Sequence, residues 1–222
     1  TIFMPHGHNA TLVAYEVSNP HDAEASIRVL PLVSFRHFHD VVTRDRPDWD
    51  ITQTPGERDV HLRPSNSELS LVLRLSDGRY VAGAGNWLRG IRLRVDEERG
   101  DSYLDDGFRP GHFELVVGPG ETRAVHLAAA AGRTEGEALG VLASVTADGR
   151  RTVEEVYRSE LRQRGGLLEG FRRRNRGVRM EDWLRWLVLA ADSFLVSRGS
   201  TGTRSVIAGY HWFGEWGRDA LI

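Results

Sequence analysis

The stretch SVIAGYHWFGEWGRDALI, residues 205–222, sets the character of this chain. It gathers four aromatic side chains around an adjacent arginine and aspartate; these residues are Tyr210, Trp212, Phe213, Trp216, Arg218 and Asp219. Arginine supplies only hydrogen-bond donors and a carboxylate only acceptors, so the pair can hold neighbouring hydroxyls in both directions. Aromatic faces can cover the apolar side of a sugar ring. The pattern predicts a sugar pocket, and an interdomain aromatic plug with a paired Arg and Asp is the alternative.

Within this stretch, AGYHWFGEWGRD at residues 208–219 resembles the signature of the bacterial and archaeal glycogen debranching enzymes, the amylo-α-1,6-glucosidase family. Related glucoamylases carry a similar Trp-x-Arg-Asp. The resemblance implies a β-sandwich domain followed by an (α/α)6 barrel. It also implies that Arg218 and Asp219 bind the non-reducing glucose in the −1 subsite. Trp216 and Trp212 would wall that subsite, with Tyr210 among the substrate-binding residues.

Just upstream, residues 181–198 predict a helix that is apolar around most of its circumference. Acidic residues in its first turn, Arg198 in its last turn and Gly199 beyond are typical helix ends. A helix apolar on nearly all sides is usually buried. We therefore expect the first helix of the barrel here, within a truncated barrel segment at residues 180–222, and a loop at residues 200–204 leading to the aromatic stretch.

The first 131 residues predict an antiparallel β-sandwich of many short strands separated by turn signals. The expected strands cover residues 11–17, 26–33, 69–76, 79–82, 91–95, 113–117 and 122–128. Asp77-Gly78 predicts a hairpin turn between the third and fourth of these strands. Residues 118–120, Gly-Pro-Gly, predict a second paired turn between the last two.

Residues 132–179 predict a helical linker. Thr134 and Glu137 have capping-box spacing, and apolar residues follow at helical spacing up to residue 148. A second helix is expected to start near Thr152. Glycine costs about 1 kcal/mol in a helix interior, so Gly165-Gly166 predicts a break or kink.

A second motif, EERGDSYLDDGFRPGHF at residues 97–113, also resembles the debranching family. The matching elements are Arg99-Gly100, the acidic pair Asp105-Asp106, and Pro110-Gly111-His112-Phe113. We expect a structural loop between strands. A calcium loop is the alternative, although the acid spacing does not match an EF-hand.

Arg36, His37 and His39 form a third segment that resembles the family's Arg-x-x-His. His37 and His39 fall on one face of an extended chain, as do His6 and His8. Two histidines without a third ligand do not make a metal site, so no metal or other cofactor is expected. Contact with the barrel domain is the preferred role for Arg36 and His39.

Composition narrows the classes of function. The 222 residues are 40% hydrophobic, with a net charge of −2 and no cysteine. This balance argues against general attraction to nucleic acid or membranes. No apolar run is long enough to span a bilayer, and a chain without cysteine suits a reducing compartment, so we expect a cytoplasmic protein. The family resemblance implies a bacterial one. The arginines at residues 172–179 are expected to be a solvated helix end and linker.

Because the chain starts at Thr1 and stops inside an apolar run, we expect a piece of a longer debranching enzyme. The resemblance implies inverting hydrolysis of α-1,6 branch points of glycogen or limit dextrin, with an acid and a base beyond Ile222. Glu215 is not expected to be catalytic; it would orient Arg218 or face solvent. The piece itself should be inactive. A glucoamylase acting on α-1,4 ends and a non-catalytic glucan-binding sandwich are the alternatives.

Overall fold

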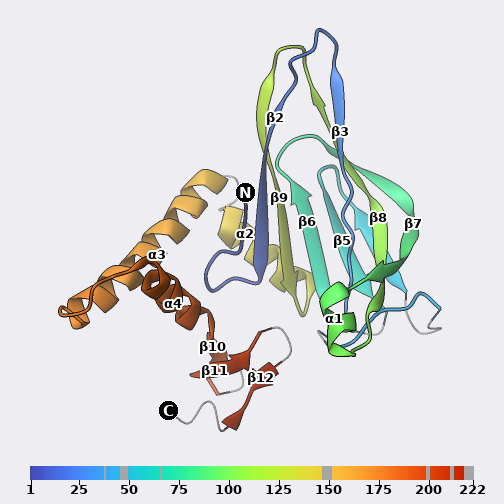
Figure 1. Ribbon diagram of the computed structural model, residues 1–222. Coiled ribbons are helices and arrows are strands. Elements are labelled where there is room, and N and C mark those ends of the chain that lie inside the picture. The colour runs from blue at the N-terminus through green and yellow to red at the C-terminus, as the bar shows by residue number, and fades with distance from the viewer. Residues whose placement is uncertain are drawn as a thin grey trace. The chain divides into compact units, whose positions relative to one another are not determined.

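The computed structural model describes residues 1–37, 39–45, 50–65, 67–146, 152–198, 201–210 and 213–217 (Figure 1). Its strands are β1 Ile2–Phe3, β2 Ala10–Ser18, β3 Ala25–Val29, β4 Ile51–Pro55, β5 Asp59–Pro64, β6 Ser70–Leu75, β7 Arg79–Arg92, β8 Leu104–Val117, β9 Thr122–Gly132, β10 Leu195–Arg198, β11 Thr203–Gly209 and β12 Phe213–Glu215. Its helices are α1 Arg94–Arg99, α2 Glu135–Thr146, α3 Val153–Arg174 and α4 Asp182–Ser193. The chain forms two compact units, Thr1–Tyr157 and Arg158–Ile222.

The first unit contains two antiparallel sheets that share one hydrophobic core. One sheet has the strand order β1-β2-β9-β6-β5-β4 and the other has the order β3-β8-β7. Apolar residues at alternate positions of β5, β6 and β9 meet those of β8 in this core. The fully buried members include Val60, Leu62, Leu75, Phe113 and Val117. This arrangement agrees with the β-sandwich predicted for the N-terminal part of the chain.

Two turns, at Asp77-Gly78 and at residues 118–120, were predicted to join paired strands. Each of them instead carries the chain from one sheet to the other. β6 pairs with β5 and β9, whereas β7 pairs with β8. The predicted Asp77-Gly78 hairpin is therefore wrong, as is the predicted pairing of β8 with β9. Gly78 has φ +95°, and a Cβ there would collide with the backbone oxygen of Glu114. The crossing thus needs a residue without a side chain.

Two local predictions between residues 91 and 113 are also wrong. The strand expected at residues 91–95 ends at Arg92, and α1 begins at Arg94. Asp96 and Glu97 in its first turn favour a helix, and Gly100 ends it with φ +80°. The expected loop containing Asp105-Asp106 is instead part of the long strand β8.

α2 packs on the face of the six-stranded sheet that points away from the sandwich core. The predicted cap forms, with the backbone N–H of Glu137 donating to Thr134 Oγ1 at 3.1 Å. Ala138, Leu142 and Val145 are buried in a second cluster against β2, β6 and β9. α2 therefore belongs to the first unit. The domain division at residues 131 and 179 stays a prediction.

α3 runs without interruption from Val153 to Arg174, so the break expected at Gly165-Gly166 is absent. Its start forms a reciprocal cap, in which Thr152 and Glu155 each accept a hydrogen bond from the other's backbone N–H. Both glycines have open space around them, and good helix formers on either side offset their cost.

In the second unit, α4 is shorter and more exposed than predicted. It ends at Ser193, and residues 195–198 form β10, which pairs with β11. Leu184 is its buried residue, while Trp183 and Trp186 are 66% and 71% exposed. The prediction that this helix is buried on most sides is therefore wrong for the described residues. Its membership of a barrel stays a proposal. Among the described residues, no helix is long and apolar enough to cross a membrane.

Candidate functional site

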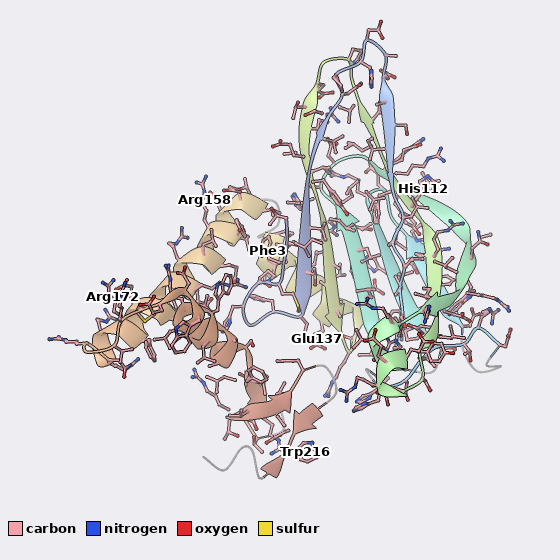
Figure 2. The ribbon with its side chains drawn as sticks, viewed as in Figure 1. Phe3, His112, Glu137, Arg158, Arg172 and Trp216 are labelled. Atoms are coloured by element: carbon pink, nitrogen blue, oxygen red, sulfur yellow. The ribbon has the colours of Figure 1, made fainter. Side chains whose placement is uncertain are left out.

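The aromatic stretch is carried by a small three-stranded antiparallel sheet of order β10-β11-β12. Leu195 lies opposite Val206, and Ile207 lies opposite Glu215. Of the loop expected at residues 200–204, residues 201 and 202 lie between β10 and β11, with Gly202 at φ +66°, whereas residues 203 and 204 belong to β11 and residue 200 lies outside the described residues. Tyr210 directly follows β11. Trp216, labelled in Figure 2, directly follows β12.

Tyr210 ties the end of β11 to the end of α4. Its hydroxyl donates to the backbone oxygen of Ser193 at 2.9 Å, and its ring lies 5.6 Å from that of Phe194. A carbonyl in the last turn of a helix has no partner within the helix, so this hydrogen bond satisfies it. The Tyr210 side chain is also 48% exposed. Its hydroxyl has a structural partner, and its ring retains an accessible surface.

Glu215 pairs with a partner that the sequence did not reveal. Its carboxylate accepts a hydrogen bond from Arg198 Nη1 at 3.2 Å, which links β12 to β10 across β11. The sequence predicts that Glu215 orients Arg218 or faces solvent, and that Arg198 lies in the last turn of a helix. A half-exposed pair of this kind contributes about 0–1 kcal/mol.

Trp216 is 46% exposed, which leaves indole surface available to a ligand. Trp212, Arg218 and Asp219 lie outside the described residues. Of the five residues predicted to bind substrate, the structure therefore places Tyr210 and Trp216, both on the small sheet.

The second and third family-like segments meet in the first unit. Asp105 accepts hydrogen bonds from Arg36 Nε at 3.1 Å and from the backbone N–H of Val42 at 2.7 Å. Asp106 accepts from the backbone N–H groups of Arg44 and Gly90, at 2.8 and 2.9 Å. Both aspartates are buried, with whole-residue exposures of 6% for Asp105 and 9% for Asp106.

These two carboxylates fasten the segment after β3 onto β8. β7 has one more residue than β8 at this point, since Leu88 pairs with Gly107 and Ile91 with Asp105. The resulting bulge presents the N–H of Gly90 to Asp106.

The carboxylate oxygens of Asp105 and Asp106 that a calcium ion would need are occupied by N–H donors. In the described part of the chain, no three histidine, aspartate or glutamate side chains are grouped as metal ligands.

Arg36 is held within the sandwich unit by Asp105 and by the carbonyl of Asp40, which accepts from Nη1 at 2.7 Å. The His37 and His39 rings lie 5.3 Å apart, and the N–H of His39 donates to His37 Nδ1. The barrel contact expected of Arg36 and His39 stays a prediction.

Comparison with known families gives two matches, in chain order. Residues 1–124 match the family model described as glycogen debranching enzyme N terminal. Residues 189–222 match the model described as amylo-alpha-1,6-glucosidase. No curated protein matches the chain. The first match spans more than half of the 222 residues and covers most of the sandwich, and the second covers the small sheet with Tyr210 and Trp216, so the chain belongs to the glycogen debranching enzyme family.

Proposed function

We propose that the protein carrying this chain hydrolyses α-1,6-glucosidic branch points of glycogen or limit dextrin and releases glucose. The observation that carries this proposal is the order of the two family matches, an N-terminal debranching-enzyme domain followed by amylo-alpha-1,6-glucosidase. The enzyme would work in the cytoplasm of a bacterium.

Within this proposal, the terminal stretch forms part of the −1 subsite. Arg218 donates to hydroxyls of the non-reducing glucose and Asp219 accepts from them, so together they fix its orientation. Trp216 and Trp212 cover its C–H face. The exposed indole of Trp216 and the bracing of its strand by the Arg198–Glu215 pair support this role.

The reaction proposed is inverting hydrolysis. One carboxylic acid protonates the leaving glycosidic oxygen, while a carboxylate activates water on the opposite face of the sugar. Inverting enzymes hold these two groups about 6.5–9.5 Å apart. The family resemblance assigns both to barrel segments that follow residue 222. Residues 1–222 then supply orientation of the glucose, and they are inactive alone because each missing proton-transfer group contributes about 10²–10⁴-fold.

The test measures glucose released from a branched limit dextrin by the full-length protein and by its Asp219→Ala variant. Misplacement of a bound substrate by about 1 Å can cost about 100-fold in rate, so we expect at least that loss. Asp182→Ala is the matched control, because the Asp182 side chain is 92% exposed on α4. Full activity of Asp219→Ala would remove Asp219 from the subsite.

The same assay separates the linkage alternatives. Glucose released from linear α-1,4 chains, with none from branch points, would replace the debranching proposal by a glucoamylase-type activity. Binding of glucan without any glucose release would favour a non-catalytic glucan-binding protein.

Trp216→Ala is expected to raise the KM for the branched dextrin about two- to tenfold, which corresponds to the loss of one aromatic stacking contact.

A further inference from the structure

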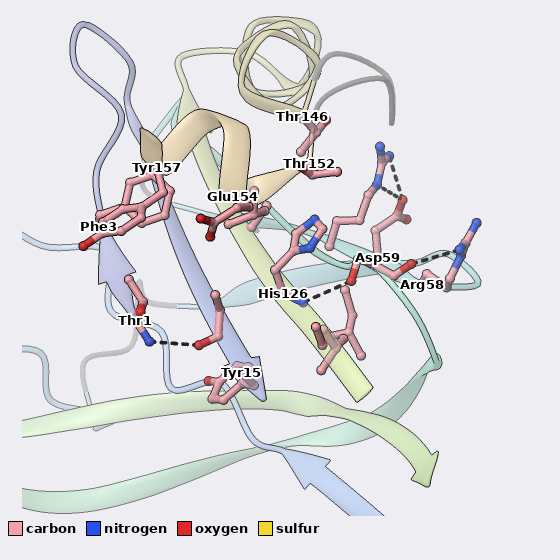
Figure 3. Close-up of a pocket in the computed structure, with 18 of the residues that line it drawn as sticks. Thr1, Phe3, Tyr15, Arg58, Asp59, His126, Thr146, Thr152, Glu154 and Tyr157 are labelled. Atoms are coloured by element: carbon pink, nitrogen blue, oxygen red, sulfur yellow. Dashed lines mark hydrogen bonds and ion pairs between the residues drawn. The ribbon is translucent and has the colours of Figure 1, made fainter. Parts of the chain in front are cut away.

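A cavity of about 850 Å³ lies in the first unit, on the same face of the six-stranded sheet as α2, over a part of that face that α2 does not cover (Figure 3). Its floor includes Ala14 of β2 and Ala124 of β9, with His126 beside them. Because alanine ends at Cβ, the sheet is hollow where α2 no longer covers it. The volume falls within the roughly 300–1,000 Å³ of small-molecule sites.

One wall of the cavity is aromatic. Phe3 of β1 and Tyr157 of α3 lie with ring centroids 5.2 Å apart at an angle of 55°. Figure 3 shows these two rings on one side of the cavity, with His126, Arg58 and Asp59 on the other. An apolar wall of this kind suits a ligand with a C–H face.

The opposite wall carries fixed hydrogen-bonding groups. Arg74 Nε and Nη2 both donate to Asp59 Oδ2, at 3.0 and 2.8 Å. Arg58 Nη1 donates to the carbonyl of Ser76 at 3.2 Å. These contacts hold planar donor and acceptor groups in place at the edge of the cavity, so a ligand would meet them with little loss of side-chain freedom.

Among the polar side chains at the cavity that have no hydrogen-bond partner within the described part of the chain, two matter for ligand binding. They are the imidazole of His126 on the floor and the hydroxyl of Tyr157 on the aromatic wall. His126 is half-buried, and burial lowers the pKa of its imidazole. It is therefore neutral at neutral pH and offers one donor and one acceptor to a ligand. Both groups are available to form hydrogen bonds with a ligand hydroxyl.

The charges around the cavity indicate a neutral ligand. The lining carboxylates of Glu57, Asp59 and Glu154 outnumber the guanidinium groups of Arg58 and Arg74. An anion such as a phosphate would meet no excess of positive charge here. A neutral molecule with many hydroxyls and one apolar face satisfies both walls.

We propose that this cavity binds an α-glucan chain, through residues different from those of the terminal stretch. The choice of glucan rests on the proposed debranching function, while the geometry supplies the neutral, polyhydroxylated ligand. A second glucan contact would hold a branched polymer during repeated cleavage, because linked contacts raise the effective concentration of the substrate.

The test follows the methyl NMR signals of Ala14 and Ala124 in the full-length protein during titration with maltoheptaose. Both methyl groups lie in the cavity floor, whereas Ala138 is a buried residue of α2 and serves as the internal reference. We expect saturable shifts of the two floor methyls at millimolar maltoheptaose and none of Ala138. Silent floor methyls would overturn the proposal.

Three variants sharpen the test. Ala124→Trp places an indole in the cavity from an exposed position and should abolish the Ala14 shift. Val116→Trp makes the same addition at a 48% exposed position of β8 and should leave the shift unchanged. His126→Ala removes one hydrogen bond and should weaken binding about fivefold. Equal weakening by both tryptophan variants, or shifts with inorganic phosphate instead of maltoheptaose, would overturn the proposal.

Glucose release is measured on the same samples, so the two proposals fail separately. Floor-methyl shifts without glucose release would remove the hydrolase proposal and leave the cavity as a glucan site. Glucose release with silent floor methyls would remove the cavity proposal alone.

Discussion

Truncating the carboxylate of Asp105 should destabilise the sandwich by about 3 kcal/mol. The side chain is 8% exposed and accepts from the Arg36 guanidinium at 3.1 Å and from the Val42 N–H at 2.7 Å. Asp105→Ala leaves both donors without this acceptor. A buried N–H without a partner costs about 1–3 kcal/mol, and breaking a buried ion pair costs about 3–5 kcal/mol.

The expected loss of about 3 kcal/mol is smaller than the sum of these two costs because Arg36 is partly exposed to water. Its side chain is 24% exposed, and Nη1 keeps the carbonyl of Asp40 at 2.7 Å. Water and that carbonyl therefore compensate part of its lost charge partner. Asp105→Asn retains an oxygen for the Val42 N–H, so we expect about half the loss, near 1.5 kcal/mol.

Urea denaturation measures the free energy of unfolding of each variant. Asp101→Ala is the matched control, because Asp101 pairs with Arg99 at 3.6 Å with both side chains about half exposed. Such a surface pair contributes about 0–1 kcal/mol.

A double-mutant cycle with Arg36→Met separates the pair from the hydrogen bond to Val42. We expect a coupling of at least about 1 kcal/mol between Arg36 and Asp105. If Asp105→Ala lost no more stability than Asp101→Ala, the fastening role of this carboxylate would be refuted.

Two further predictions concern the sheet face that carries α2. Burial lowers the pKa of His126 below the roughly 6.5 of an unfolded histidine, so the unfolded chain binds more protons between the two values. This component of stability is present above about pH 6.5 and is lost as the pH falls through the pKa of the folded state. In the His126→Gln variant, the urea midpoint should therefore change less with pH below 6.5 than in the wild type. A curve parallel to that of the wild type would contradict this. Leu142 of α2 is fully buried against the sheet, so Leu142→Ala should lower the free energy of unfolding by about 2–5 kcal/mol in the same denaturation assay. A loss under about 1 kcal/mol would argue against the packing of α2 on the sheet.

Features that depend on a few neighbouring residues could be predicted from the sequence. The cap of α2 was correctly placed at Thr134, because its hydrogen bond joins residues only three apart. The strands predicted at residues 11–17 and 69–76 correspond to β2 and β6, since short strands between turn signals leave a local pattern in the sequence. The family was identified from residues 208–219, where several uncommon side chains lie close together in the chain.

Features that depend on contacts between residues far apart in the chain could not be predicted from the sequence. A Gly-containing turn such as Asp77-Gly78 has the same local signal whether it joins paired strands or crosses between sheets. Asp105-Asp106-Gly107 has the composition of a loop, yet it lies in β8 because β7 and the segment after β3 supply the N–H donors that its carboxylates need. The end of α4 was misplaced because β11 pairs with residues 195–198.

The amino-acid order alone thus decided the family, the β character of the first 131 residues and the start of each long helix, since these depend on local pattern and spacing. The tertiary structure decided which strands pair, what Arg36 and Glu215 contact, and where a cavity opens beside His126. Those outcomes depend on contacts between residues far apart in the chain, and their geometry exists only once the sheets have packed.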